Sequence, residues 1–411
     1  MRAIYSFAII LYSIAIKITA AFGNQKAKLW VAGRKNWEKE LSSINPENKK
    51  VTWFHVASLG EFEQARPLIE AIKQKEPKSF ILLSFFSPSG FEIRKNYELA
   101  DKVTYLPIDT PKNAKLFLKL TNPQRVIFVK YEFWFNFLNQ ISEHKIECYL
   151  VSGIFRKSQH FFKWYGHWFK KHLSAFTFFF VQNETSVELL KSLQFRNVRL
   201  TGDTRLDRVM SITREVFHDL RFTTFATNSS VVIFGSSWEQ ENEFAVALSK
   251  TDVNCKIIIA PHEINSTRIE TLKNRFSVSC KLLSKTKKDE NLSELNVLII
   301  DQIGLLSKLY RYADCAFIGG GFGHGIHNTL EAVAYSKPVL FGPNYHKFQE
   351  AYDLINEGAG YCVANEIEFL EAIRQLILDE EVYKNASKNA ASYILQNQGA
   401  TQKIISLLYS N

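Results

Sequence analysis

The sequence predicts an α/β protein made of two parallel-sheet domains of similar size. Short apolar strands alternate with amphipathic helices along most of its 411 residues, and the alternation occurs in two series. Strands separated by helices form parallel βαβ units whose sheet is covered on both faces. A chain of this length can fill two cores. We therefore expect two Rossmann-like halves that face each other across a cleft lined by strand ends and loops.

The predicted strands fall on either side of a polar segment that has no strand character. Those of the first series are residues 51–57, 80–84, 102–107, 125–129, 147–151 and 176–181. Those of the second series are residues 231–235, 256–260, 297–300, 315–319 and 338–342. We expect a membrane anchor, a first domain, a linker, a second domain and C-terminal helices that pack back on the first domain, with the bounds 1–22, 23–205, 206–222, 223–380 and 381–411.

Composition limits the possible partners and the compartment. The net charge of +10 favours anionic partners such as nucleotides and phospholipid headgroups. No compact basic run accompanies a nucleic-acid fold signature, so we expect no nucleic-acid partner. Five scattered cysteines without CxxC spacing indicate a reducing compartment and no structural zinc site. The chain has no Asp-x-Asp, so a metal-bridged diphosphate site of that type is unsupported.

The N-terminus has the pattern of a membrane anchor. Residues 4–22 form an apolar run of nearly bilayer-spanning length in which Lys17 is the one charge. Basic residues and Trp30 and Trp37 follow, which suits an interface with anionic headgroups. A cleaved signal peptide and a buried core helix are the alternatives. With an anchor, the basic flank places the body of the protein on the cytoplasmic side.

Candidate chemistry in the first half begins at the turn that carries Ser58, Gly60 and Glu61. The pattern Ser-x-x-Glu is a capping box, which requires no function. Alternatively, Glu61 lies at the carboxyl end of the strand and faces the cleft as a general base. A helix N-terminus lowers a carboxyl pKa, so burial would have to raise it again.

Two further segments of the first half have open interpretations. Lys130 and Glu132 follow a predicted strand and are either residues of the cleft or a surface ion pair. Residues 161–172 mix aromatic and basic side chains, and they form either a core helix with a solvated edge or a lipid-docking face.

The second half carries a glycine-rich turn, residues 317–331, at the end of a predicted strand. We expect it to open a helix that carries Asn328 and Glu331 one turn apart. Gly320 and its neighbours let backbone N–H groups approach a phosphate, and a carboxylate at Glu331 can reach a ribose diol. Two other strand ends add candidate phosphate contacts, namely Gly235, Ser236, Ser237, Pro261 and His262.

In this order the motifs resemble the Kdo transferases, which add 3-deoxy-D-manno-octulosonic acid (Kdo) to a lipid A precursor. The resemblance runs to about Ala351. It is carried by residues 57–61 (Ala-Ser-Leu-Gly-Glu), 87–90 (Ser-Pro-Ser-Gly), 105–111 (Tyr-Leu-Pro-Ile-Asp-Thr-Pro), 132–134 (Glu-Phe-Trp), 181–184 (Val-Gln-Asn-Glu), 201–202 (Thr-Gly), 325–331 (Gly-Ile-His-Asn-Thr-Leu-Glu) and 337–343 (Lys-Pro-Val-Leu-Phe-Gly-Pro).

The resemblance implies a GT-B fold, a CMP-Kdo donor, a lipid A precursor as acceptor and no metal or other cofactor. It also implies an inner-membrane enzyme among anionic lipids. Glu61 would be the catalytic base, and Glu132 would work in the acceptor site, to which we also assign Ser58, Gly60 and Lys130. Donor contacts would fall on the strand-end residues named above and on Gly320, His327, Asn328 and Glu331.

This chain departs from the family pattern at three places. Lys130 stands where the family usually has an acid. No Arg adjoins His262, and Ser152-Gly-Ile154 replaces Asn-Ala-Arg. Two alternatives to Kdo transfer stay open: a transferase that uses a UDP-sugar and a lipid acceptor, and a non-catalytic, membrane-tethered binding protein for nucleotide sugars.

Overall fold

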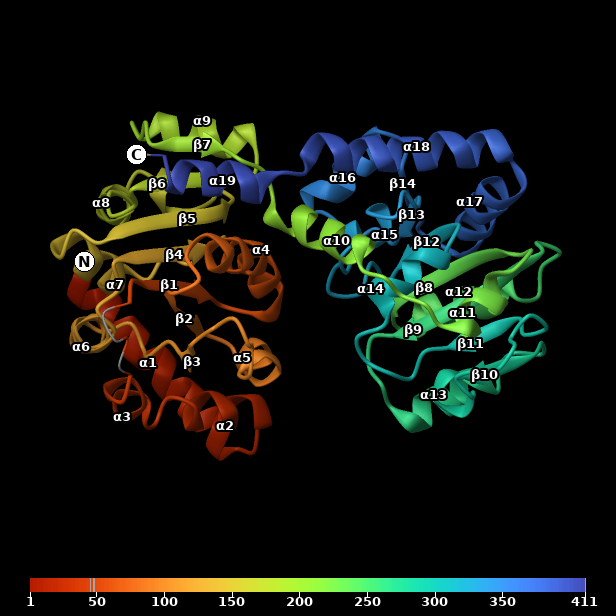
Figure 1. Cartoon of the computed structure of the whole chain (residues 1–411), viewed down its shortest axis with the longest axis horizontal. Helices are drawn as coiled ribbons and strands as arrows, with labels where there is room; N and C mark the ends of the chain where they lie inside the picture. Colours follow the sequence, from red (N-terminus) through yellow and green to blue (C-terminus); the bar gives the residue numbers. More distant parts are fainter. Residues whose placement is uncertain (45, 47–48, 411) are drawn as a thin grey trace. The chain divides into compact units, whose positions relative to one another are not determined.

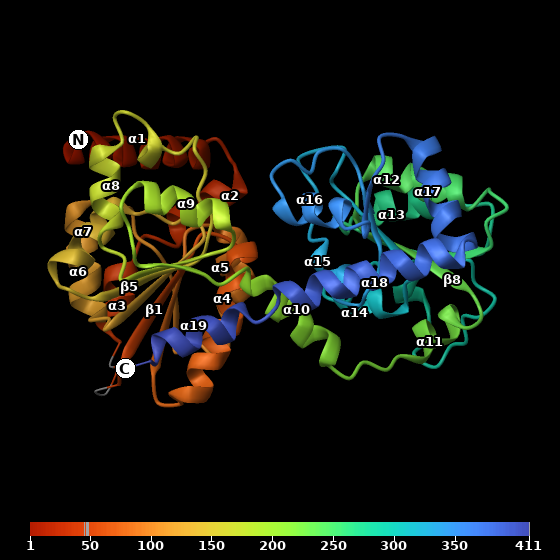
Figure 2. The same cartoon turned by 90° about the horizontal axis from the view of Figure 1, so that it is seen from above.

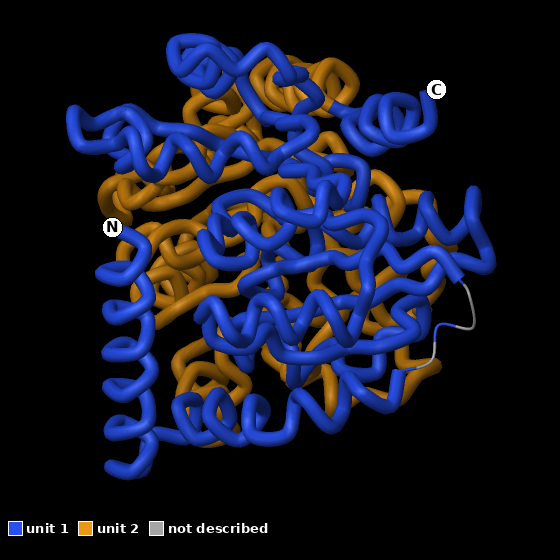
Figure 3. The backbone as a smooth tube through the Cα atoms, turned by 90° about the vertical axis from the view of Figure 1, so that its left-hand side faces the viewer, with its two compact units in different colours: residues 1–208, 398–411 blue, residues 209–397 orange. Residues whose placement is uncertain are grey.

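The chain divides into two compact units in a computed structural model that describes residues 1–44, 46 and 49–410. The first unit contains residues 1–208 and 398–411, and the second contains residues 209–397 (Figure 3). The boundary falls after Arg208, and the last fourteen positions of the chain return to the first unit. Each unit is built around its own parallel sheet.

The sheet of the first unit has seven parallel strands in the order β3-β2-β1-β4-β5-β6-β7 (Figure 1). Their bounds are β1 (Val51–Val56), β2 (Phe80–Phe85), β3 (Lys102–Tyr105), β4 (Arg125–Val129), β5 (Glu147–Gly153), β6 (Phe178–Val181) and β7 (Val198–Leu200). The direction in which strands are added reverses between β1 and β4. In sheets of this kind ligands bind outside the carboxyl ends of the strands at such a reversal.

Helices cover both faces of this sheet because successive strand residues point to opposite sides. Val51 and Trp53 belong to one buried cluster, whereas Phe54 and Val56 belong to the other. The helices are α1 (Arg2–Ala21), α2 (Gln25–Ala32), α3 (Trp37–Ser42), α4 (Leu59–Lys75), α5 (Pro88–Arg94), α6 (Pro111–Thr121), α7 (Phe135–Glu143), η1 (His160–Phe162), α8 (His167–Leu173), α9 (Glu184–Ser192) and α19 (Ala400–Leu408).

The second unit repeats this plan with the strand order β10-β11-β9-β8-β12-β13-β14. Its strands are β8 (Ser230–Ser237), β9 (Cys255–Pro261), β10 (Cys280–Leu282), β11 (Val297–Ile299), β12 (Cys315–Ile318), β13 (Val339–Phe341) and β14 (Gly360–Cys362). Its helices are α11 (Leu220–Ala226), α12 (Glu239–Leu248), α13 (Ser266–Lys273), η2 (Leu283–Lys285), α14 (Leu306–Leu309), η3 (Tyr310–Tyr312), α15 (Leu330–Val333), α16 (Gln349–Asn356), α17 (Glu366–Leu378) and α18 (Glu380–Asn397). The reversal here lies between β8 and β12.

The segment predicted as a linker is largely helical. Helix α10 (Thr204–Arg214) occupies its first half, and α11 begins at Leu220. The sequence gives a reason for α10, since Leu206 and Val209 are three residues apart and both are buried. The boundary between the two units, after Arg208, falls within this segment.

The C-terminal helices predicted as one group belong to different units. Helix α18 stays with the second unit, whereas α19 packs on α4 of the first through Ile404 and Ile405. The turn before α19 is fixed by Asp207, whose carboxylate accepts hydrogen bonds from the N–H groups of Gly399 and Thr401, each at 2.6 Å.

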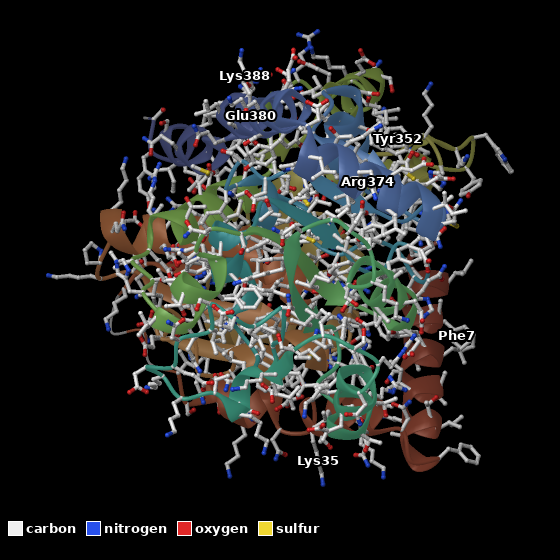
Figure 4. All side chains as sticks on the ribbon, turned by 90° about the vertical axis from the view of Figure 1, so that its right-hand side faces the viewer. Phe7, Lys35, Tyr352, Arg374, Glu380 and Lys388 are labelled. Carbon is white, nitrogen blue, oxygen red and sulfur yellow. The ribbon has the colours of Figure 1, made fainter. Side chains whose placement is uncertain are left out.

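Helix α1 runs along the outside of the first unit (Figure 3). Among the described residues, it is the one helix that is long and apolar enough to cross a membrane. Of its twenty residues only Ser13 and Ala20 are buried, so the alternative of a core helix is wrong. Phe7 is 61% exposed and points away from the ribbon (Figure 4).

The aromatic and basic segment 161–172 is not one helix. It consists of η1, a short loop and most of α8. Phe161 is buried in the core, whereas Trp164 is 95% exposed. The core interpretation therefore holds for Phe161, and the loop leaves a bare aromatic surface at Trp164.

Candidate active site

The two candidate carboxylates of the first unit lie after neighbouring strands. Glu61 is in the first turn of α4, which follows β1, and Glu132 follows β4. Strands β1 and β4 pair in parallel, with His55 opposite Phe128 near their carboxyl ends. Both acids are thus at the reversal point of the sheet.

The capping-box interpretation of Ser58 and Glu61 is only half right. Ser58 is the N-cap of α4, but its side chain makes no capping hydrogen bond. The carboxylate of Glu61 does reach back, and its Oε2 accepts a hydrogen bond of 2.5 Å from the N–H of Ala57.

The pKa of Glu61 is raised to about 8 despite that hydrogen bond. Burial is the largest cause, and the nearby carboxylate of Glu132 is the second. The N–H of Ala57 and the charge of Lys130 act in the opposite direction. A carboxyl group with such a pKa can exchange a proton near neutral pH, which suits a general base.

Glu132 is held by a network of ring N–H groups. Its Oε2 accepts a hydrogen bond of 2.6 Å from Nε1 of Trp134 and lies 3.1 Å from Nε2 of His55. The fully buried His55 is in turn fixed through Nδ1, which lies 2.8 Å from Oγ of Ser84. Nε1 of Trp53 donates a 2.7 Å hydrogen bond to the same Oγ. With both its ring nitrogens bound, His55 positions the carboxylate of Glu132.

Lys130 belongs to a group of cations next to Glu61. Its backbone has φ 65°, and its N–H donates a 2.9 Å hydrogen bond to the carbonyl of Val151. Nζ of Lys130 and the guanidinium of Arg156 lie 5.3 and 5.4 Å from the ring centre of Tyr131. Arg156 and Arg205 lower the pKa of Tyr131, but its burial raises the pKa more. The surface beside the base is therefore suited to an anionic substrate group.

In the second unit, three rings stack at the strand ends. Trp238 follows β8, His262 follows β9 and His327 lies within the glycine-rich turn. Ring centres are 4.6 Å apart between Trp238 and His262, and 4.4 Å apart between His262 and His327. Burial and the neighbouring His262 lower the pKa of His327 to about 4, so its imidazole is neutral at neutral pH.

A cavity of about 560 Å³ lies beside this stack. Its lining includes Trp238, His262, His327, Gly320 and the buried Glu241. The carboxylate of Glu241 accepts hydrogen bonds of 2.8 Å from the N–H groups of Gly320 and Trp238. It ties the glycine-rich turn to the start of α12, and so fixes the shape of the cavity.

Glycine is required where the turn folds back on itself. Gly320 has φ 91°, and a Cβ there would lie 2.4 Å from the carbonyl oxygen of Gly325 and 3.2 Å from the ring of His327. Gly325 has φ 123°. These positions need left-handed backbone and close approach, which only glycine combines at low cost.

The remaining predicted donor residues lie in two other places. Ser237 and Pro261 line a neighbouring cavity of about 310 Å³, which shares Trp238 with the larger one. Gly235 packs against the hydroxyl of Tyr310, whose pKa is raised by burial and then by Glu331. Ser236, which lies between Gly235 and Ser237 in the chain, has φ 52°.

The prediction that Asn328 and Glu331 share a helix is wrong in part. Helix α15 begins at Leu330, so Asn328 precedes it. Oδ1 of Asn328 accepts a hydrogen bond of 3.3 Å from the N–H of Leu330, and its Nδ2 donates one of 3.1 Å to Glu331. Thr329 already has helical φ and ψ. Before it, the N–H groups of Ile326 and His327 donate to the carbonyls of Asn344 and Gly319 and not to a helical turn.

Sequence reasoning missed several residues of both sites. His55, Ser84, Trp238, Glu241 and Arg156 have no place in the sequence prediction. A histidine inside the apolar strand Val51–Val56 was the available signal for His55, because a buried imidazole needs partners. The other missed residues are recognisable only from their neighbours in the folded structure. Within the described parts of the chain, no three His, Cys, Asp or Glu side chains are grouped as metal ligands.

A family model described as 3-deoxy-D-manno-octulosonic-acid transferase (Kdo transferase) matches residues 35–208. That range contains both carboxylates and the strands that carry them. Residues 35–208 therefore match the Kdo transferase family, whose members are glycosyltransferases.

Relatives in two bacteria extend the likeness beyond the matched range. A bifunctional glycosyltransferase/methyltransferase of Fusobacterium nucleatum is 26% identical over 401 residues, which are 95% of this chain. This chain spans 61% of the length of that relative. A 3-deoxy-D-manno-octulosonic acid transferase of Aquifex aeolicus is 28% identical over 350 residues, covering 83% of this chain and 90% of the relative.

A solved structure shares the fold. The UDP-GlcNAc 2-epimerase of Neisseria meningitidis matches 88% of this chain with a TM-score of 0.63 and 17% identity, and all of the epimerase is covered. Two Rossmann-like units with parallel sheets make this a GT-B fold, as the resemblance implied.

Proposed function

We propose that this chain transfers Kdo from CMP-Kdo to the 6′-hydroxyl of a lipid A precursor, with inversion at the anomeric carbon. One observation carries the proposal: Glu61 stands at the reversal point of the first sheet with a pKa near 8, beside a second, rigidly held carboxylate. A base with that pKa can take a proton from a sugar hydroxyl during attack.

In the proposed reaction Glu61 removes the proton of the acceptor hydroxyl while its oxygen attacks C2 of Kdo. The bond from C2 to the phosphate oxygen of CMP breaks, and CMP leaves as an anion. Glu132 holds the acceptor sugar, and Lys130 accepts an anionic acceptor group beside it. Because Glu132 is already fixed by Trp134 and His55, it needs no rearrangement to orient the acceptor.

On the donor side, we assign the 560 Å³ cavity of the second unit to the phosphate and sugar of CMP-Kdo. The N–H groups of Gly320, Gly323 and Gly325 already donate within the protein. The neutral His327 and the exposed His262 therefore offer their ring nitrogens to the donor. Preorganised donors of this kind can stabilise a leaving phosphate without a metal. Asn328 and Glu331 are assigned to the ribose, outside that cavity.

We place the reaction at the cytoplasmic face of the inner membrane, among anionic lipids. Helix α1, with its exposed apolar side chains, supports this placement. The net charge of +10 would also attract a phosphorylated acceptor.

Glu61→Gln tests the assignment of the base. Loss of general-base assistance should lower turnover by about 10²–10⁴-fold. Glu70→Gln is the matched control, because Glu70 is on the same helix and pairs with Arg66 at 2.8 Å. It should retain turnover. Near-normal turnover by Glu61→Gln would remove Glu61 from the role, while equal losses in both variants would point to damage to α4.

A further inference from the structure

A cavity of about 380 Å³ lies in the first unit next to the candidate membrane helix. Its walls come from three segments: α1, α2 and the turn between β2 and α5. The apolar part of the lining is Tyr12, Ile16, Ala27, Trp30, Phe86 and Pro88. Helices α1 and α2 lie side by side at this edge of the unit (Figures 1 and 2). The volume is within the range of about 300–1,000 Å³ that is usual for ligand sites.

The buried Arg34 holds two walls of this cavity together. Its guanidinium lies 3.9 Å from the ring centre of Trp30 and 4.9 Å from that of Phe86. It also donates hydrogen bonds to the carbonyl oxygens of Phe86, at 2.7 Å, and Leu106, at 2.8 Å. Its donors thus serve the backbone rather than a carboxylate, and the cavity is a formed part of the fold.

The far wall of the cavity touches the candidate acceptor site. The ring of Phe86 lies 4.8 Å from that of Trp134, whose N–H donates to Glu132. In α5, which follows this turn, Gly90 approaches the start of α4 so closely that a Cβ would lie 3.0 Å from the backbone nitrogen of Leu59. Only the ring of Phe86 therefore separates a ligand in the cavity from Trp134, the residue that holds Glu132.

We propose that this cavity holds one acyl chain of the lipid acceptor and thereby presents its sugar to Glu61 and Glu132. The inference rests on the proposed function. Tyr12 and Ile16 line the cavity from the same helix that exposes Ile4, Phe7 and Ile18, so the cavity opens beside a surface suited to lipid hydrocarbon. Lys26, also in the lining, supplies a cation for a phosphate on the attached headgroup.

The link to Glu132 favours the acceptor over a bulk phospholipid. A phospholipid chain in the cavity would bring its own headgroup to Trp134 and Glu132 and would compete with the substrate. Burial of an acyl chain of the acceptor would instead strengthen the binding of the reacting sugar. Binding energy from a part of the substrate that does not react can orient the part that does.

Ala27→Phe tests the proposal, because Ala27 is a buried residue of the lining and the larger ring would fill the space. Ala32→Phe is the control, since Ala32 is exposed on the same helix and outside the lining. Both enzymes are assayed in detergent with the tetraacylated precursor and with a precursor from which all acyl chains have been removed.

We expect Ala27→Phe to raise KM for the acylated precursor by about tenfold, the loss when about two methylenes leave the cavity. Its kcat/KM for the deacylated precursor and its KM for CMP-Kdo should equal those of the wild type and of Ala32→Phe. An unchanged KM, or equal losses on both acceptors, would overturn the proposal.

Photolabelling separates the possible occupants. A tetraacylated precursor with a diazirine near the end of its chains should label Tyr12 or Trp30, and excess unlabelled precursor, but not phosphatidylglycerol, should suppress the labelling. Equal suppression by phosphatidylglycerol would assign the cavity to phospholipid and overturn the proposal. Failure of the wild type to transfer Kdo to either acceptor would instead refute the proposed function.

Discussion

Replacing Glu132 with Gln tests whether the two carboxylates act on each other as the structure indicates. Burial and the charge of Glu132 both raise the pKa of Glu61 to about 8. Gln removes the charge but keeps an oxygen that can accept the N–H of Trp134. The variant should therefore bind the acceptor more weakly, and Glu61 should lose its proton at a lower pH than in the wild type.

The size of the shift follows from the nature of the interaction. A charge close to a buried carboxyl moves its pKa by about 1–3 units, and each unit is about 1.4 kcal/mol. Burial remains in the variant, so we expect the pKa of Glu61 to fall by about 1–2 units and to stay above its ordinary value.

The assay is kcat/KM for the acceptor between pH 5 and 10, which reports ionisation of the free enzyme. A base must be deprotonated, so activity should rise with pH through about 8 in the wild type and through a lower pH in Glu132→Gln. Lys130→Met is the opposing control, because Lys130 lowers the pKa of Glu61 and its loss should move the profile to higher pH. An unmoved or alkaline profile for Glu132→Gln would refute the reasoning.

Three other predictions concern stability and cofactors. At pH 9, Glu61→Gln should unfold with a free energy about 2 kcal/mol larger than that of the wild type, after allowance for solvent screening; at pH 5 the two should be nearly equal. The reason is that the pKa of Glu61 is raised in the folded state. Such a group stabilises the fold below its unfolded pKa, and this stabilisation is lost as the pH rises through about 8. Urea unfolding at both pH values measures this, and a larger gap at pH 5 would contradict it. Gly320→Ala should cost about 1–3 kcal/mol, because its backbone has φ 91° and a Cβ would meet the carbonyl of Gly325; Gly60→Ala, with nothing closer than 4.0 Å, should be tolerated, and equal melting temperatures would count against the strain. Transfer activity should persist in EDTA, since we assign the leaving charge to the histidines beside the glycine-rich turn. Loss of activity that a divalent cation restores would reverse that assignment.

Much of the fold was predictable because the apolar pattern of each strand, and the alternation of strands with helices, can be read directly along the sequence. Every strand predicted in residues 51–181 overlaps a strand of the first sheet, since buried parallel strands are continuous apolar runs. Helix α10 was missed because its two buried apolar side chains, Leu206 and Val209, are too few to form a conspicuous stripe. Helix α15 begins later than predicted, because the N–H groups of Ile326 and His327 donate to the carbonyls of Asn344 and Gly319.

The site was predictable where one turn carries the chemistry. Glu61, Glu132 and His327 follow strands, and parallel strands bring their carboxyl ends to one edge. The residues that tune them were not predictable in this way. His55 and Glu241 act through partners distant in sequence, Ser84 and Gly320, and the pKa of Glu61 depends on burial that no local pattern records.

The most direct test is the mass of the product that the purified, detergent-solubilised protein makes from the tetraacylated lipid A precursor. With CMP-Kdo we expect the precursor to gain the mass of one or more Kdo residues, and with UDP-GlcNAc we expect no gain. A precursor that stays unchanged with CMP-Kdo, or one that gains an N-acetylhexosamine from UDP-GlcNAc, would contradict the proposed Kdo transfer.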